Sequence, residues 1–163
     1  MKENLILIGM MGCGKSTVGA LLSARLGREL VDTDAMIEAQ EGCSIPALFA
    51  ERGEAYFRDC EIRAARALAD RAGLVIACGG GLPMREACIR PLWESGVVFW
   101  LDRDPGEIYD SGVLGDRPLA QDGRTAFLER FCQRAPIYRR WAHHIISASS
   151  PEAAAEAILE VIQ

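Results

Sequence analysis

Lysine is scarce in this 163-residue chain: Lys2 and Lys15 are the only lysines among its 18 lysines and arginines. Acidic residues outnumber basic ones, and the formal net charge is −5. This balance argues against nucleic acid or an anionic membrane as the main partner, so the arginines are expected to act locally on small anions. A single internal lysine among many arginines marks Lys15 as a position that needs a slim point charge rather than a guanidinium.

Cysteine pairs and long apolar runs are also missing. The cysteines show no C-x-x-C spacing and no metal-like cluster; they are Cys13, Cys43, Cys60, Cys78, Cys88 and Cys132. This pattern predicts free thiols in a reducing cytoplasm rather than a disulfide framework or a zinc site. No apolar run approaches the length of a membrane span, and the one near the N-terminus is broken by Gly9. We therefore expect a cytoplasmic protein without a membrane segment.

Residues 9–16 read GMMGCGKS and match the pattern G-x-x-x-x-G-K-[ST] in full. The glycines let the backbone curl so that its N–H groups converge on a polyphosphate. Lys15 would place a cation near the β- and γ-phosphates, and the Ser16 hydroxyl could ligate Mg²⁺. An apolar run over residues 5–8 precedes this loop, and a helical pattern that stops at Gly27 follows it. This context of strand, loop and helix predicts that the chain binds a nucleoside triphosphate.

Apolar runs alternate with helical patterns along the whole chain. Strands are expected at residues 5–8, 29–32, 74–78, 97–101 and 144–146. Helices are expected at residues 18–26, 35–40, 45–50, 54–71, 84–94, 106–111, 125–141 (with a break near Pro136) and from Pro151 onward. This alternation predicts an α/β fold of the P-loop NTPase type, a three-layer αβα sandwich around a five-stranded parallel sheet. We expect a single domain over residues 1–163, because no linker or repeat interrupts the pattern.

Two aspartates follow the second expected strand, at the edge of an open α/β sheet where ligands collect. Asp32 and Asp34 are spaced i, i+2, so one carboxylate can serve Mg²⁺ while the other acts on a substrate hydroxyl. Asp32 is the candidate for the metal. The alternative is an ordinary helix N-cap, and the neighbouring phosphate-binding loop favours the catalytic interpretation.

Three further features have both a functional and an ordinary interpretation. Arg58 and Glu61 lie one helical turn apart, so the carboxylate could aim the guanidinium at an anionic substrate; a surface ion pair is the alternative. Glycines at residues 79–81 follow a buried strand and would let a ligand lie on the backbone, unless they form only a flexible turn. Arg117 follows a helix that fails at Gly112 and could close over the nucleotide; the alternative is a solvated loop arginine.

Taken in order, these motifs resemble the shikimate kinase family, a small member of the P-loop group that includes the nucleoside-monophosphate kinases. The resemblance covers about residues 5–142. It rests on the P-loop, Asp32-x-Asp34, Gly53-Glu54-x-x-Phe57-Arg58-x-x-Glu61, the glycines at 79–81, Arg117-Pro118-Leu119 and Arg134-x-Pro136-x-Tyr138-x-x-x-Ala142. The resemblance implies a transferase that uses ATP and Mg²⁺ to phosphorylate the 3-hydroxyl of shikimate, in aromatic amino acid biosynthesis.

The resemblance also implies roles for individual residues. The catalytic residues would be Lys15, Asp34 as candidate base, and Arg117 as lid arginine. The shikimate site would comprise Asp34, Arg58, Gly79, Gly80, Gly81 and Arg134, with both arginines on the carboxylate. The nucleotide site would comprise Gly12, Cys13, Gly14, Lys15, Ser16, Thr17 and Arg117, with Mg²⁺ on Ser16 and Asp32. Residues 33–60 would form the acceptor-binding region and residues 111–124 the lid, in a protein that we expect to be monomeric.

The chain departs from the family pattern just before the lid. Members usually carry an arginine there that packs over adenine, but residues 109–116 contain no basic residue. Their two acids should weaken ATP binding unless Tyr109 stacks on the base. Two other functions stay open: a related kinase for gluconate or a nucleotide, and a weakly active homologue that binds a ligand. The paired Arg58 and Arg134 argue against the first, and only the unusual lid supports the second.

Overall fold

A computed structural model describes residues 3–115 and 122–163. Five parallel strands form one sheet in the order β2-β3-β1-β4-β5. The strands are β1 (Asn4–Ile8), β2 (Leu30–Asp32), β3 (Val75–Ala77), β4 (Gly96–Leu101) and β5 (His144–Ile146). The five strands that the sequence predicts are therefore confirmed, together with their parallel arrangement.

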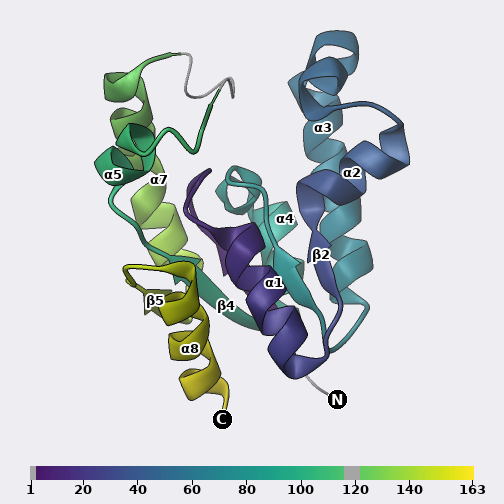
Figure 1. Cartoon of the computed structure of the whole chain (residues 1–163). Helices are drawn as coiled ribbons and strands as arrows, with labels where there is room; N and C mark the ends of the chain where they lie inside the picture. The colour runs from purple at the N-terminus through teal and green to yellow at the C-terminus, as the bar shows by residue number, and fades with distance from the viewer. Residues whose placement is uncertain (1–2, 116–121) are drawn as a thin grey trace.

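Helices cover both faces of this sheet. They are α1 (Lys15–Leu26), α2 (Thr33–Glu41), α3 (Ile45–Ala69), α4 (Glu86–Ser95), α5 (Pro105–Asp110), α7 (Arg124–Trp141) and α8 (Pro151–Ile162), with a 3₁₀ turn at Leu82–Met84. Figure 1 shows α1 and α8 together on one side of the sheet, while α4 lies behind it and packs against α3. The predicted three-layer α/β sandwich is confirmed. None of the described helices is both long and apolar enough to cross a membrane.

The central strand β1 explains why the site forms where it does. All five of its residues are buried, and it pairs with β3 on one side and β4 on the other. The strands beside β1 run parallel to it, so their carboxyl ends all lie at the same edge of the sheet. The loops after β1, β2 and β3 therefore start from the same edge of the sheet and can contribute to one site.

One helix prediction is confirmed in detail and another differs from the structure. The helices expected at residues 45–50 and 54–71 both form within α3, and they are separated by a kink at Gly53, whose φ of 82° and ψ of 170° are not helical. The break expected near Pro136 is wrong, because α7 runs through it without interruption. Pro136 is exposed, so water can solvate the carbonyl that this residue leaves without an intrahelical donor.

A small apolar cluster, separate from the main core, joins α2 to α3. It consists of Ile37, Leu48, Phe57, Cys60 and Ala64, all of them buried. Because Phe57 immediately precedes Arg58, this packing fixes which side of α3 faces the edge of the sheet.

All six cysteines of the chain are unpaired, including Cys60 in this cluster.

Candidate active site

The loop between β1 and α1 has the backbone that a phosphate-binding loop requires. Gly9, Gly12 and Gly14 have φ values of 146°, 80° and 100°, which disfavour residues with a side chain. A Cβ at Gly12 would lie 2.9 Å from Ile108 Cγ2, so α5 packs directly on this loop. Lys15 Nζ donates to the carbonyl oxygens of Gly9 and Met10 at 2.8 and 2.9 Å. The loop thus holds its own cation in place at the N-terminus of α1.

Asp32 serves as a helix cap and also lies beside the phosphate-binding loop. Its Oδ1 accepts from the Ala35 amide at 3.1 Å, which caps α2. Its Oδ2 accepts from Ser16 Oγ, also at 3.1 Å. Mg²⁺ commonly takes one or two protein oxygens and completes its shell with water and phosphate oxygens, so this pair fits the ion. Elsewhere in the described chain, no group of three or more His, Cys, Asp or Glu side chains is placed to hold a metal.

Asp34 occupies a tighter position than its neighbour. A Cβ at Gly79 would lie 2.6 Å from Asp34 Oδ1, so the carboxylate rests directly on the glycine backbone. That Oδ1 is buried and has no hydrogen-bond partner. Burial raises the pKa of Asp34, and the charge of Asp32 raises it further, while Lys15 and Arg58 oppose the shift. A carboxylate with one free oxygen and a raised pKa is suited to accept a proton from a hydroxyl.

Two guanidinium groups from distant helices meet over the glycine triplet. A Cβ at Gly81 would lie 3.2 Å from Arg58 Nη1 and 3.4 Å from Arg134 Nη2. A Cβ at Gly80 would lie 3.2 Å from Arg134 Nη1. Arg58 comes from α3 and Arg134 from α7, so the fold brings together two residues that are 76 positions apart in the sequence. Two forked cations over a bare backbone form a site that suits a small carboxylate.

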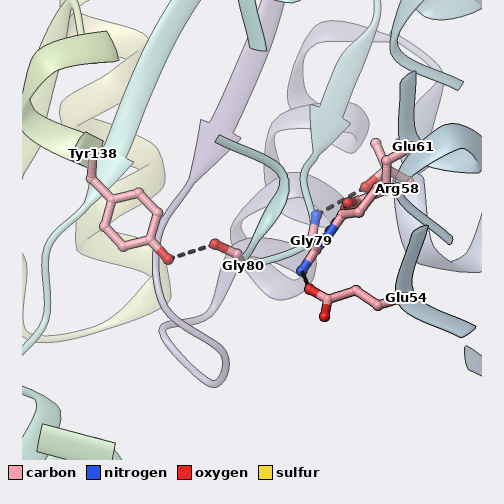
Figure 2. Close-up of polar contacts among 7 residues, drawn as sticks. Glu54, Arg58, Glu61, Gly79, Gly80 and Tyr138 are labelled. Carbon is pink, nitrogen blue, oxygen red and sulfur yellow. Dashed lines mark hydrogen bonds and ion pairs between the residues drawn. The ribbon is translucent and has the colours of Figure 1, made fainter. Parts of the chain in front are cut away.

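Acidic side chains hold Arg58 in this position. Arg58 Nη1 donates to Glu61 Oε1 at 2.5 Å, and Nη2 to Glu54 Oε1 at 3.4 Å, as Figure 2 shows. Glu61 is 1% exposed, so this is not the surface ion pair that was the alternative. Burial raises the pKa of Glu61, whereas the bond from Arg58 lowers it.

The glycine triplet is fixed rather than flexible. The Gly79 amide donates to Thr33 Oγ1 at 2.9 Å, and the Gly79 carbonyl accepts from the Leu82 amide at 3.0 Å. The Gly80 carbonyl accepts from Tyr138 Oη at 2.7 Å (Figure 2). The flexible-turn alternative is therefore wrong. Sequence reasoning missed Thr33, because a polar residue between the two aspartates has no distinguishing signal until the fold places its hydroxyl beside the Gly79 amide.

Residues 109–116 contain no basic residue, but Arg124 supplies a cation to this segment through an ion pair with Asp110. Arg124 Nε and Nη2, at the start of α7, donate to Asp110 Oδ1 and Oδ2 at 3.0 and 3.3 Å. Sequence reasoning missed Arg124 because it stands at the far end of the expected lid and reaches back to α5 only in the fold. Arg117, the expected lid arginine, lies outside the described residues.

Comparison with known proteins adds an independent line of evidence. A family model described as "Shikimate kinase" matches residues 11–163 of the chain. A shikimate kinase of Persephonella marina is 43% identical over 138 residues, which are 83% of this chain and 84% of that protein. A shikimate kinase of Clostridium beijerinckii is 39% identical over 146 residues, which are 90% of this chain and 86% of that protein.

Solved structures give the same answer. A shikimate kinase from Acinetobacter baumannii in complex with shikimate superposes with a TM-score of 0.91 at 34% identity, covering 99% of this chain and 93% of that one. The shikimate kinase of Aquifex aeolicus has a TM-score of 0.81 at 32% identity, covering 98% and 95% of the two chains.

Proposed function

Because the chain belongs to the shikimate kinase family, and so phosphorylates the 3-hydroxyl of shikimate with ATP and Mg²⁺, we propose how its residues divide this reaction. One observation carries the proposal: Arg58 and Arg134 converge over the glycine triplet, and Asp34 lies against the same backbone. A hydroxylated ring that bears a carboxylate matches this arrangement. The carboxylate lies on the two guanidiniums, and a ring hydroxyl reaches Asp34.

Asp34 is the base in this proposal. Its carboxylate accepts the hydrogen bond of the attacking hydroxyl and takes its proton as the hydroxyl oxygen bonds to the γ-phosphorus and the bond from that phosphorus to the leaving ADP oxygen breaks. Most of the rate enhancement in phosphoryl transfer comes from positioning and charge stabilisation, so the base contributes only part of it. Lys15 supplies a fixed positive charge to the transferring group. Arg117 would close over the phosphates from the lid, residues 111–124.

The phosphates of ATP lie on the N–H groups of the loop, from Gly12 to Thr17 and including Cys13, Gly14, Lys15 and Ser16, at the N-terminus of α1. Ser16 and Asp32 would hold Mg²⁺, which when bound offsets phosphate charge. The hydrogen bond from Ser16 Oγ to Asp32 Oδ2 supports this assignment, because it brings the two oxygens within 3.1 Å of each other. Asp32 keeps its other oxygen on the Ala35 amide, so α2 orients the metal-binding carboxylate.

A coupled ATPase assay, with and without shikimate, tests the proposal. We expect ADP release to require shikimate, to yield one phosphorylated product per ADP, and to vanish in Lys15→Ala. Arg25→Ala is a matched control, since Arg25 forms only a surface pair with Glu156 in α8. ADP release that did not depend on shikimate would overturn the assignment of Arg58 and Arg134 to the shikimate carboxylate. So would faster release with gluconate or a nucleotide as acceptor.

We also propose that the protein works as a cytoplasmic monomer with small molecules as its partners, neither nucleic acid nor membrane. The six free thiols suit a reducing compartment. Exposed large apolar side chains of the described residues are few and come from four separate segments, namely Trp93, Val113, Ile145 and Val161. So few exposed apolar side chains suit a protein that works without an obligate interface. Light scattering on the purified chain measures the oligomeric state.

A further inference from the structure

Tyr138 is a buried tyrosine whose hydroxyl bonds most closely to the Gly80 carbonyl and also contacts Met10 Sδ and the guanidinium of Arg134 at the active site. The residue is 0% exposed, and its ring packs against Trp100 with centroids 5.8 Å apart. Its hydroxyl donates to the Gly80 carbonyl oxygen at 2.7 Å, across the gap between α7 and the glycine triplet (Figure 2). Burial raises the pKa of Tyr138 to about 12, so the phenol remains a neutral donor over the working pH range.

Gly80 lies where the acceptor site meets the phosphate-binding loop. A Cβ at this glycine would lie 3.4 Å from the Met11 amide nitrogen and 3.5 Å from the Gly9 carbonyl oxygen. Tyr138 Oη is also 3.7 Å from Met10 Sδ, on the same loop. The phenol therefore touches both sides of this junction.

The helix that carries Tyr138 also carries Arg134, one of the two arginines that we assign to the carboxylate of shikimate. Arg134 precedes Tyr138 by one helical turn in α7, and its guanidinium lies over Gly80 and Gly81. A displacement of Gly80 relative to α7 would move the backbone on which the acceptor lies. It would also change the distance between that backbone and Arg134. Such a displacement would also shift the acceptor hydroxyl relative to the phosphates, and in-line transfer is sensitive to shifts of this kind.

We propose that Tyr138 is a positioning residue, whose hydroxyl fixes Gly80 against the phosphate-binding loop and so sets the acceptor in line for transfer. Tyr138 touches no reacting atom in this proposal and acts through Gly80 and Arg134. Without the phenol oxygen, the half-buried carbonyl of Gly80 loses the one side-chain donor that the described residues give it. The Gly80 backbone can then shift toward water or another donor, because no side chain of α7 holds this carbonyl in place.

The first test is Tyr138→Phe, assayed for kcat and for the KM of each substrate. We expect kcat/KM for shikimate to fall about tenfold, which corresponds to about 1.4 kcal/mol, while KM for ATP stays within about twofold. Ser95→Ala in α4 is the matched control. It also removes a hydroxyl that donates to a backbone carbonyl, that of Leu92 at 2.8 Å, and it should keep the parental constants for both substrates.

A second variant separates the hydrogen bond from the packing of the ring. Incorporating 4-aminophenylalanine at position 138 keeps the ring and restores an N–H donor at the same place, so it should recover most of the lost kcat/KM. Thr33→Val removes the oxygen that accepts from the Gly79 amide, on the other side of the triplet, and should also lower kcat/KM for shikimate.

Three outcomes would overturn the proposal. A folded Tyr138→Phe enzyme with parental kcat/KM for shikimate would show that the bond does not position the acceptor. Equal losses in Tyr138→Phe and the amino variant would assign the effect to packing alone. A rise in KM for ATP as large as the effect on shikimate would indicate general loosening of the active site.

Discussion

Asp34 combines a structural cost with a chemical use. Its Oδ1 is buried without a partner, and burial together with the nearby Asp32 raises its pKa. Either effect would count against a residue that served only the fold. Beside Lys15 and the glycine triplet, both effects prepare the carboxylate to accept a proton, which explains why the chain tolerates the cost.

The pH dependence of activity should report this carboxylate. Since only the ionised form is a base, kcat/KM for shikimate should fall as the pH drops through the raised pKa of Asp34, above the range of an ordinary aspartate. Asp32→Asn removes a charge that raises this pKa, so at saturating Mg²⁺ its acid limb should move to lower pH. Asp34→Asn should lose most of kcat at every pH. The profile of Asp32→Asn is the decisive record: an acid limb that stayed in place would show that another group controls the titration.

Single residues also mark the limit of sequence interpretation. For Asp32, helix cap and metal ligand are alternatives in the sequence, yet the structure gives each oxygen its own task. A one-dimensional pattern treats a residue as a unit, whereas a carboxylate has two acceptors that can point to different partners. For Arg58, spacing predicts the pair with Glu61, but only the fold shows that Glu61 is buried.

At the scale of elements, α7 connects parts of the site that the sequence keeps apart. Arg124 at its start pairs with Asp110 of α5, and Arg134 and Tyr138 near its end reach the glycine triplet. Helical periodicity predicts that α7 exists, but not which of its faces turns toward α5 or β3. Those contacts join residues far apart in the chain, so no local pattern encodes them.

The pair between Arg124 and Asp110 should influence nucleotide binding. Arg124→Gln leaves Asp110 uncompensated close to the phosphate-binding loop, on which α5 packs. We expect KM for ATP to rise about two- to fivefold at low salt, because an uncompensated rim charge acts on a polyphosphate until salt screens it. The effect should shrink in about 0.5 M salt, where the screening length is only a few ångströms, and KM for shikimate should not change.

The double variant Asp110→Asn with Arg124→Gln provides the control for this prediction. It removes both charges, so its KM for ATP should return close to the parental value. If the double variant were as weak as Arg124→Gln, the arginine would contact the nucleotide itself and the pair would not be its main role.

For the whole molecule, the buried β1 and its neighbours are the most predictable part. Each strand is a short apolar run between turn signals, and the alternation of strands with helices leaves few topologies possible. The sequence therefore predicts the five strands and the layers correctly. It does not predict how Thr33 and Tyr138 fix the glycine triplet, because a buried polar side chain gains its partner only after the sheet has formed.

The stability of the whole fold should show the cost of Asp34. Because its folded-state pKa is raised, the folded protein binds more protons than the unfolded chain between the two pKa values. The free energy of unfolding therefore falls as pH rises through that window, and stays lower above it. Asp34→Asn removes this dependence, so its melting temperature should exceed that of the parent by a few degrees at pH 7, with less difference near pH 4.

Thermal unfolding of both proteins from pH 4 to pH 8 checks this prediction. A melting temperature of Asp34→Asn below the parental value at pH 7 would mean that the attraction to Lys15 and Arg58 outweighs burial. Glu29→Gln is a suitable control, since Glu29 forms only a surface pair with Arg71 and should barely change the curve.

The central claim is that Arg58 and Arg134 grip the carboxylate of shikimate, and the most direct measurement is substrate KM in Arg58→Lys and Arg134→Lys. Each enzyme should be assayed with shikimate and with its carboxamide, which keeps the ring hydroxyls but lacks the charge. Lysine cannot reproduce a bidentate fork, so KM for shikimate should rise about 10- to 100-fold. KM for the carboxamide and for ATP should change by less than about twofold. Equal losses for shikimate and the carboxamide would contradict the account, because the two arginines would then be holding something other than the carboxylate.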